Sequence, residues 1–159
     1  MGEIGLETGS PREREIFAAQ LDLGSELRSM GKRMGIHTPR SDKLAITQEI
    51  LSILESYSGL EAITVVDHCT PETIGWVLEK GYWAGVTLSP VKASFSDLGQ
   101  IVERHPGHLN RIMCNTDSGS IFYEDLYDLC QSDMFSPKIR NQLVSENVFG
   151  FFRLRRTGS

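Results

Sequence analysis

The stretch VVDHCTPETIGWVLEKGYWAGVTL, residues 65–88, decides the fold class. It begins as a β-branched apolar strand that ends at Asp67-His68. Thr70-Pro71 is a helix start signal and Gly81 is a stop signal, and a second apolar run follows. A strand, a helix and a strand in this order predict a βαβ unit, whose two strands run parallel and are joined by a right-handed crossover.

The same alternation continues along the chain in both directions. Apolar segments typical of strands lie at residues 1–7, 33–38, 62–68, 82–89 and 111–117. Helical patterns lie at residues 11–30, 42–57, 71–80, 95–105, 121–131 and 137–148. About five βα units predict an α/β fold with a parallel sheet. Two architectures fit this order: a partial TIM (β/α)8 barrel, whose full form needs about 250 residues, and a flavodoxin-like doubly wound sheet.

Length and composition limit the class of protein. The chain has 159 residues, of which 40% are hydrophobic and 23% charged, and its net charge is −5. We assign residues 1–150 to one globular domain and residues 151–159 to a basic, flexible tail. The acidic balance argues against a broad surface that coats nucleic acid, although it is compatible with a small basic cleft.

The sequence also bears on location. No apolar run is long enough to cross a membrane, and the N-terminus lacks the pattern of a signal peptide. The chain has only three cysteines, Cys69, Cys114 and Cys130. This odd, small number, with no CxxC pair, argues against a disulfide framework. We therefore expect a cytoplasmic protein without a membrane partner.

Four side chains that can bind a metal stand at or near the ends of predicted strands. They are Glu3, His37, His68 and Asp117, whereas the strand ending in Thr87-Leu88-Ser89 offers no strong ligand. Imidazole and carboxylate groups together suit zinc, manganese and similar divalent ions. Strand ends converge around one axis in a barrel but spread along a line in a doubly wound sheet, so this pattern favours the barrel.

Each of these residues also has a plain structural interpretation. A single histidine at a strand end is usually a hydrogen-bonded polar residue, Glu3 could be a solvated charge, and Asp117 could cap the next helix. The joint pattern is more informative than any one member. Asp67 precedes His68, so in an extended strand its side chain should point to the opposite face.

Two cations follow strand ends and could bind a phosphate. They are Arg40, in the segment HTPR, and Lys92. Solvated charge is the simpler interpretation of both, and for Lys92 we prefer it.

Several segments resemble the TatD-like metal-dependent hydrolases, the TatD family of DNases within the amidohydrolase superfamily. The segments are GEIGLE, REREIFAAQLDLGSEL, GIHTPR, VVDHCTPET, YWAGVTLSP and NTDSG, and they cover nearly the whole chain in the order of the family. The family has a TIM-barrel fold and a centre of one or two divalent ions, here Zn, Mn or Mg, and several members cleave DNA.

The resemblance assigns roles to the candidate residues. It implies that Glu3 bridges the metal ions from barrel strand four, and that His37 and His68 are the ligands of strands five and six. Asp117 would be the ligand and proton acceptor of strand eight. Strand seven of the family carries no ligand, which agrees with the strand ending at Ser89.

The chain also departs from the family pattern. The first three strands of the family, with their HxH pair, have no counterpart, and Asn115 replaces a common glutamate. Five strands cannot close a barrel, so we expect an additional N-terminal segment or a homo-oligomer.

The expected function is metal-activated hydrolysis of phosphodiester bonds. Metal-bound water would attack DNA or a small phosphoester, with Asp117 as the catalytic proton acceptor and Arg40 as a substrate-binding cation. The alternative is a truncated, inactive remnant of such an enzyme that still binds metal.

Overall fold

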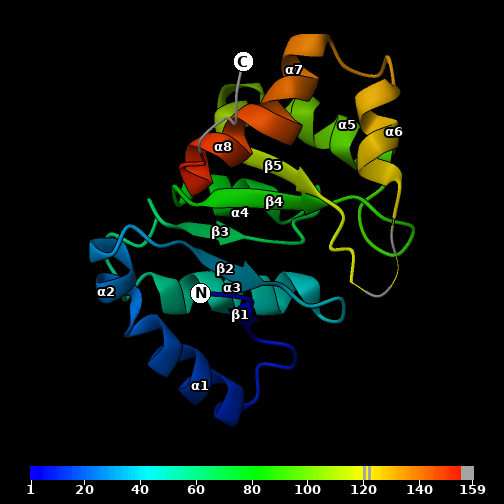
Figure 1. Cartoon of the computed structure of the whole chain (residues 1–159). Coiled ribbons are helices and arrows are strands. Elements are labelled where there is room, and N and C mark those ends of the chain that lie inside the picture. Colours follow the sequence, from blue (N-terminus) through cyan, green and yellow to red (C-terminus); the bar gives the residue numbers. More distant parts are fainter. Residues whose placement is uncertain (120, 122, 155–159) are drawn as a thin grey trace.

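The computed structural model describes residues 1–119, 121 and 123–154. They form a parallel sheet of five strands: β1 (Ile4–Gly5), β2 (Met34–His37), β3 (Thr64–Val66), β4 (Trp83–Thr87) and β5 (Ile112–Asn115). The strands lie in the sheet in the order of the sequence, β1-β2-β3-β4-β5, and all neighbouring pairs are parallel (Figure 1). A flavodoxin-like sheet would have the order 2-1-3-4-5. The observed order is instead that of a barrel sector, as the clustered strand ends predicted.

Helices follow each strand, as predicted. They are α1 (Pro11–Leu21), α2 (Gly24–Ser29), α3 (Lys43–Leu54), α4 (Ile74–Glu79), α5 (Phe95–Arg104), α6 (Asp125–Gln131), α7 (Pro137–Asn141) and α8 (Asn147–Phe152). A 3-10 turn, η1 (Pro106–Arg111), precedes β5, and a π-helical turn, η2 (Gln142–Glu146), joins α7 to α8. Within the described residues, no helix combines the length and apolar character needed to cross a bilayer.

Some helix bounds differ from the prediction. The helix predicted at residues 11–30 is divided into α1 and α2 at Asp22 and Leu23, and a Cβ at Gly24, the first residue of α2, would lie 2.5 Å from the Leu60 side chain. The helix predicted at 71–80 begins only at Ile74. Thr73 closes a preceding turn, in which its hydroxyl accepts a hydrogen bond from the Thr70 amide at 3.0 Å.

The two faces of the sheet differ in character. One face contributes buried residues such as Ile36, Val66 and Val86 to the hydrophobic core, and Figure 1 shows α3 and α4 behind it. The other face carries Val65 and Met113, which line a pocket together with residues of η2 and α8. Parallel strands end together, so the polar side chains beyond β2, β3 and β5 are brought to one edge.

The C-terminal part of the chain is partly described. Helix α8 continues past residue 150, and Phe151 is buried against Trp83, with ring centroids 5.1 Å apart. Residues 155–159 of the predicted tail lie outside the described residues. The division of the chain at residue 150 stays a prediction.

Candidate metal centre

Glu3, His37 and His68 come together at the carboxyl edge of the sheet. One potential ligand atom from each lies within 4.8 Å of the other two. Glu3 Oε1 is 3.0 Å from His68 Nε2 and 3.6 Å from His37 Nδ1. The two imidazole rings meet edge to face, with centroids 5.0 Å apart. A carboxylate and two imidazoles at this spacing are a donor set that fits a divalent ion such as zinc or manganese.

The three side chains reach this point from three neighbouring strands. His37 is the last residue of β2, and His68 follows β3 by two residues. Glu3 directly precedes β1, so its expected place at the end of that strand is wrong. Its carboxylate still reaches the two histidines, because the pairing of Gly5 with His37 places β1 beside the end of β2.

His68 has an unusual backbone conformation that shapes the centre. Its φ of 59° lies in the left-handed region, which non-glycine residues seldom adopt. The turn is held by Asp67, whose Oδ1 accepts a hydrogen bond from the His68 amide at 2.8 Å. Because His68 is not extended, the alternation of side chains ends there. The prediction that Asp67 points away from His68 is therefore wrong: Asp67 Oδ1 lies 3.9 Å from His68 Nδ1.

Burial favours the neutral form of His68. The residue is only 5% exposed, and this burial is the main cause that lowers its pKa, against the opposing effect of Asp67. A neutral imidazole is the form that binds a metal.

Asp117 stands beside the cluster rather than within it. It follows β5 by two residues and also has a positive φ, of 50°. Its Oδ2 accepts a hydrogen bond from Lys92 Nζ at 2.6 Å, and this bond is the largest cause of its lowered pKa. Lys92 Nζ lies in turn 2.9 and 3.0 Å from the ring nitrogens of His68. Asp117 is thus linked to the cluster through Lys92, and its role as a metal ligand stays a prediction.

Lys92 belongs to the site, contrary to its preferred interpretation as a solvated charge. Its side chain is only 11% exposed, because the loop after β4 carries it back over His68. No local pattern in the sequence predicts this position, since it depends on how that loop folds.

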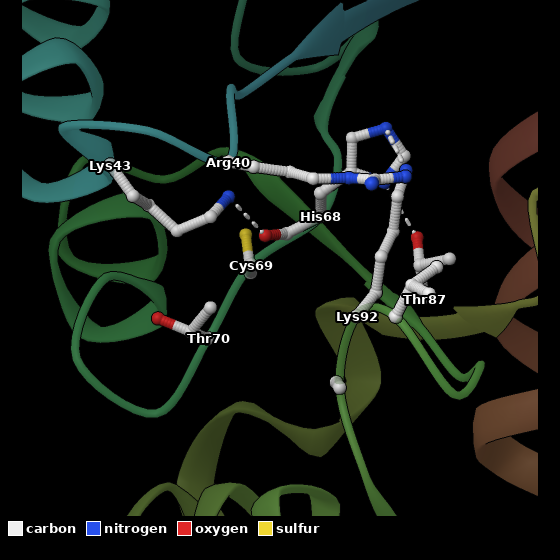
Figure 2. A pocket seen from close by; sticks show the side chains of 9 residues that line it. Arg40, Lys43, His68, Cys69, Thr70, Thr87 and Lys92 are labelled. Carbon is white, nitrogen blue, oxygen red and sulfur yellow. Dashed lines mark hydrogen bonds between the residues drawn. The ribbon is translucent and has the colours of Figure 1, made fainter.

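A pocket of about 260 Å³ adjoins the cluster (Figure 2). Three cations line it, Arg40, Lys43 and Lys92, and no carboxylate does among the residues that the structure describes. Lys43 donates hydrogen bonds to Thr38 Oγ1 at 2.8 Å and to the His68 carbonyl at 2.9 Å, and burial lowers its pKa. Within residues 1–119, 121 and 123–154, no hydrogen bond or ion pair of the Arg40 side chain is found. The pocket is therefore suited to an anion, with Arg40 available to bind it.

Cys69 also lines this pocket, but it is not a reactive group. Complete burial raises its pKa to about 12. At neutral pH the side chain is a thiol, so it behaves as a small buried apolar group.

A polar network that the sequence pattern does not predict adjoins His68. Thr87 Oγ1 lies 2.7 Å from His68 Nδ1 and 2.9 Å from Asn115 Oδ1. Asn115 Nδ2 in turn donates to both carboxylate oxygens of Asp67, at 3.0 and 3.2 Å. The strand ending at Ser89 was set aside because it lacks a strong ligand. A threonine two residues before that end was the available signal.

The loop after β1 borders the other side of the cluster. Glu7 Oε2 lies 2.9 Å from His37 Nε2. Glu13 fixes the loop, because its carboxylate accepts hydrogen bonds from the amides of Glu7, Thr8 and Gly9. The bond from the Thr8 amide is the largest cause of the lowered pKa of Glu13.

A parallel sheet in barrel order, with a carboxylate and two histidines at its carboxyl edge, defines an α/β protein of TIM-barrel type with a candidate metal centre. The chain is 32% identical to a TatD-like protein of known structure from Archaeoglobus fulgidus, with a TM-score of 0.70, over 97% of this chain and 60% of that one. It is 24% identical to an uncharacterized metal-dependent hydrolase of Methanocaldococcus jannaschii, over 97% of this chain and 61% of the relative. The predicted resemblance is thereby confirmed: the chain is similar to a TatD-like protein and to a protein described as a metal-dependent hydrolase.

The fold is supported by a more distant structure as well. A phosphotriesterase homology protein from Escherichia coli, solved with phosphate in its active site, has a TM-score of 0.72 and 20% identity, over 96% of this chain and 58% of that one. No family model matches the chain. The chain spans about 60% of the length of these relatives.

Proposed function

We propose that the chain hydrolyses phosphodiester bonds with a divalent ion held by Glu3, His37 and His68. The observation that carries this proposal is the spacing of these three side chains, whose potential ligand atoms lie within 4.8 Å of one another. Burial keeps His68 neutral and ready to bind a metal. A divalent ion at this place would lower the pKa of a bound water towards about 7.

The remaining residues of the site have roles toward the substrate and the proton. The lowered pKa of Asp117 keeps its carboxylate ionised beside Lys92, so it can ligate the ion and accept a proton from water. Arg40 offers a guanidinium that can donate two parallel hydrogen bonds to phosphate oxygens.

The charge of the neighbouring pocket supports a phosphoester over a neutral ester. Among the described residues, three cations and no carboxylate line a space of about 260 Å³, which is large enough for a phosphoryl group. DNA and small phosphodiesters both carry such a group. The phosphate in the active site of the E. coli structure concerns that protein, and it agrees with this choice of substrate.

A second candidate is an inactive remnant that binds metal without catalysis. The observation that favours it is the sheet. Within the described residues β1 and β5 each have one neighbouring strand, so both edges lack a partner strand and the sheet does not close around the site.

Hydrolysis assays with defined metals separate these candidates. The purified chain is tested with Mn²⁺, Mg²⁺ or Zn²⁺ on single-stranded DNA, on bis(4-nitrophenyl) phosphate and on 4-nitrophenyl acetate, together with a measurement of bound metal. We expect metal-dependent cleavage of the two phosphodiesters, lost in His68→Ala and reduced at least about 100-fold in Asp117→Asn. His108→Ala, a histidine remote from the cluster, is the matched control.

The possible results assign the function clearly. Equal rates in all four proteins would rule out catalysis by this centre. Bound metal without turnover of any substrate would establish the remnant, and cleavage of the acetate alone would exclude a phosphodiesterase.

A further inference from the structure

In the polar network beside His68, the Asp67 carboxylate determines which group donates and which accepts in each hydrogen bond. The Asp67 carboxylate can only accept, so the group that faces both of its oxygens, Asn115 Nδ2, must donate. This fixes the Asn115 amide with its Oδ1 toward Thr87 Oγ1, 2.9 Å away. An amide oxygen can only accept, so the Thr87 hydroxyl must donate to it.

The same assignment of donors and acceptors determines the hydrogen bond between Thr87 and the His68 imidazole. A hydroxyl has one proton, and both other acceptors near Thr87, Asn115 Oδ1 and Asp67 Oδ1 at 3.3 Å, lie in the network. The Thr87 oxygen therefore presents a lone pair to His68 Nδ1, 2.7 Å away. Nδ1 must carry the proton to complete this bond, so the lone pair of a neutral His68 is on Nε2.

We propose that Thr87 is a positioning residue, which holds His68 as the Nδ1–H tautomer with Nε2 turned to the metal. This assignment builds on the proposed metal centre, where Nε2 lies 3.0 Å from Glu3 Oε1. In this tautomer Nε2 and Glu3 Oε1 both present lone pairs, and their mutual repulsion at 3.0 Å is relieved by a cation that lies near both atoms. The Lys92 ammonium lies 2.9 Å from Nδ1 and 3.0 Å from Nε2, and in this tautomer only Nε2 can accept a hydrogen bond from it.

Packing keeps this network in one arrangement. Thr87 is 1% exposed, and it is paired in register with Asn115 on the adjacent strand. Gly85 leaves the space that the Asp67 carboxylate fills, since a Cβ there would lie 2.2 Å from Asp67 Oδ1. The neutral amide of Asn115 also avoids charge repulsion with Asp67, because a carboxylate at position 115 would face the Asp67 carboxylate at about 3 Å.

The test compares Thr87→Val, Thr87→Ser and Thr64→Val. Thr64 is a matched control on the neighbouring strand: it is fully buried, and its hydroxyl has no hydrogen-bond partner among the described residues. The first measurement is the tautomer of His68, from ¹⁵N–¹H correlation spectra of the chain without metal at pH 8. The second is the dissociation constant of Mn²⁺ or Zn²⁺ by titration calorimetry at the same pH.

We expect the Nδ1–H tautomer to dominate in the wild type, in Thr87→Ser and in Thr64→Val, and the ring signals to shift toward the Nε2–H form in Thr87→Val. Loss of such an outer hydrogen bond typically weakens metal affinity about 10–100-fold. We expect that loss in Thr87→Val, with recovery to within about threefold in Thr87→Ser and no change in Thr64→Val.

A second variant covers the case in which Thr87→Val does not fold. Thr87→Ala removes the same hydroxyl with a smaller, unbranched side chain, so it should also shift the tautomer. A wild-type Nε2–H tautomer, or unchanged tautomer and affinity in Thr87→Val and Thr87→Ala, would overturn the proposal. Absence of metal binding in the wild type would instead overturn the proposed function, while the tautomer spectra would still decide the role of Thr87.

Discussion

At the scale of single residues, the candidate centre depends on positions where the backbone departs from regular structure. His68 and Asp117 both have positive φ, of 59° and 50°. Such conformations cost about 1–3 kcal/mol each and persist where the surroundings enforce them. At His68 the hydrogen bond to Asp67 does so. Close packing at Gly85 then leaves the Asp67 carboxylate little freedom to move.

The first prediction concerns Gly85. In Gly85→Ala the new methyl group would lie 2.2 Å from Asp67 Oδ1, so the carboxylate must move away from the His68 amide. We expect a loss of about 1–3 kcal/mol in the free energy of unfolding, measured by urea denaturation. Gly35→Ala is the control, because nothing lies within 4 Å of a Cβ at that position. Equal stability of the two variants would show that Asp67 is not held in place.

The second prediction concerns His105 and pH. Burial lowers the pKa of His105, helped by the charges of His108 and Arg104. The unfolded chain then binds more protons as the pH falls below about 6.5, so this contribution to stability is present above that pH and is lost on acidification. We expect His105→Gln to lose less stability than the wild type between pH 7.5 and pH 5.5, in urea titrations. An equal loss in both would contradict the assignment.

At the scale of elements, α8 attaches the end of the chain to the sheet. Phe151 packs against Trp83, and the Arg33 guanidinium lies 5.3 Å from the centre of the Phe151 ring. Arg33 Nε also donates a hydrogen bond to the Phe151 carbonyl. These contacts attach the helix to the sheet at the start of β2 and β4, at the opposite ends of these strands from the metal centre.

The third prediction tests this attachment. Phe151 is 2% exposed and its neighbour Phe152 is 46% exposed. Phe151→Ala should lower the free energy of unfolding by about 3–5 kcal/mol, whereas Phe152→Ala should lower it by less than about 1 kcal/mol. Urea denaturation of both variants provides the comparison. Similar losses would mean that α8 does not pack as described.

At the scale of the whole molecule, the candidate metal centre joins three parts of the sheet. Its residues belong to the segments at β1, β2 and β3, which are distant in sequence. A bound ion would therefore tie the β1 edge of the sheet to its centre. A ligand that binds only the folded state stabilises it by mass action.

The fourth prediction follows from this linkage. At a free metal concentration of 100 times Kd the folded state gains about 2.7 kcal/mol, which for a chain of this length raises Tm by roughly 5–10 °C. Differential scanning calorimetry with and without Mn²⁺ or Zn²⁺ measures the shift. It should disappear in His68→Ala and remain in His108→Ala. A shift that survives in His68→Ala would place the ion elsewhere.

The sequence by itself determined the repeated strand and helix units, because apolar periodicity and start and stop signals are local properties. It also placed His37, His68 and Asp117 near strand ends, since parallel strands deliver their carboxyl ends to one edge. The bounds of the helices were less predictable. At the start of α2, for example, Gly24 lies so near Leu60, far away in the chain, that a Cβ would not fit there, and no local pattern predicts this approach.

Only the tertiary structure decided which polar residues surround His68. Lys92, Thr87 and Asn115 reach it through the register of β4 with β5 and the course of one loop, and neither is written in a local pattern. Asp67 joins them because His68 leaves the extended conformation, which reverses the side expected from strand alternation. The physical reason is that alternation follows from the backbone of each strand alone, whereas hydrogen-bond partners between strands follow from packing.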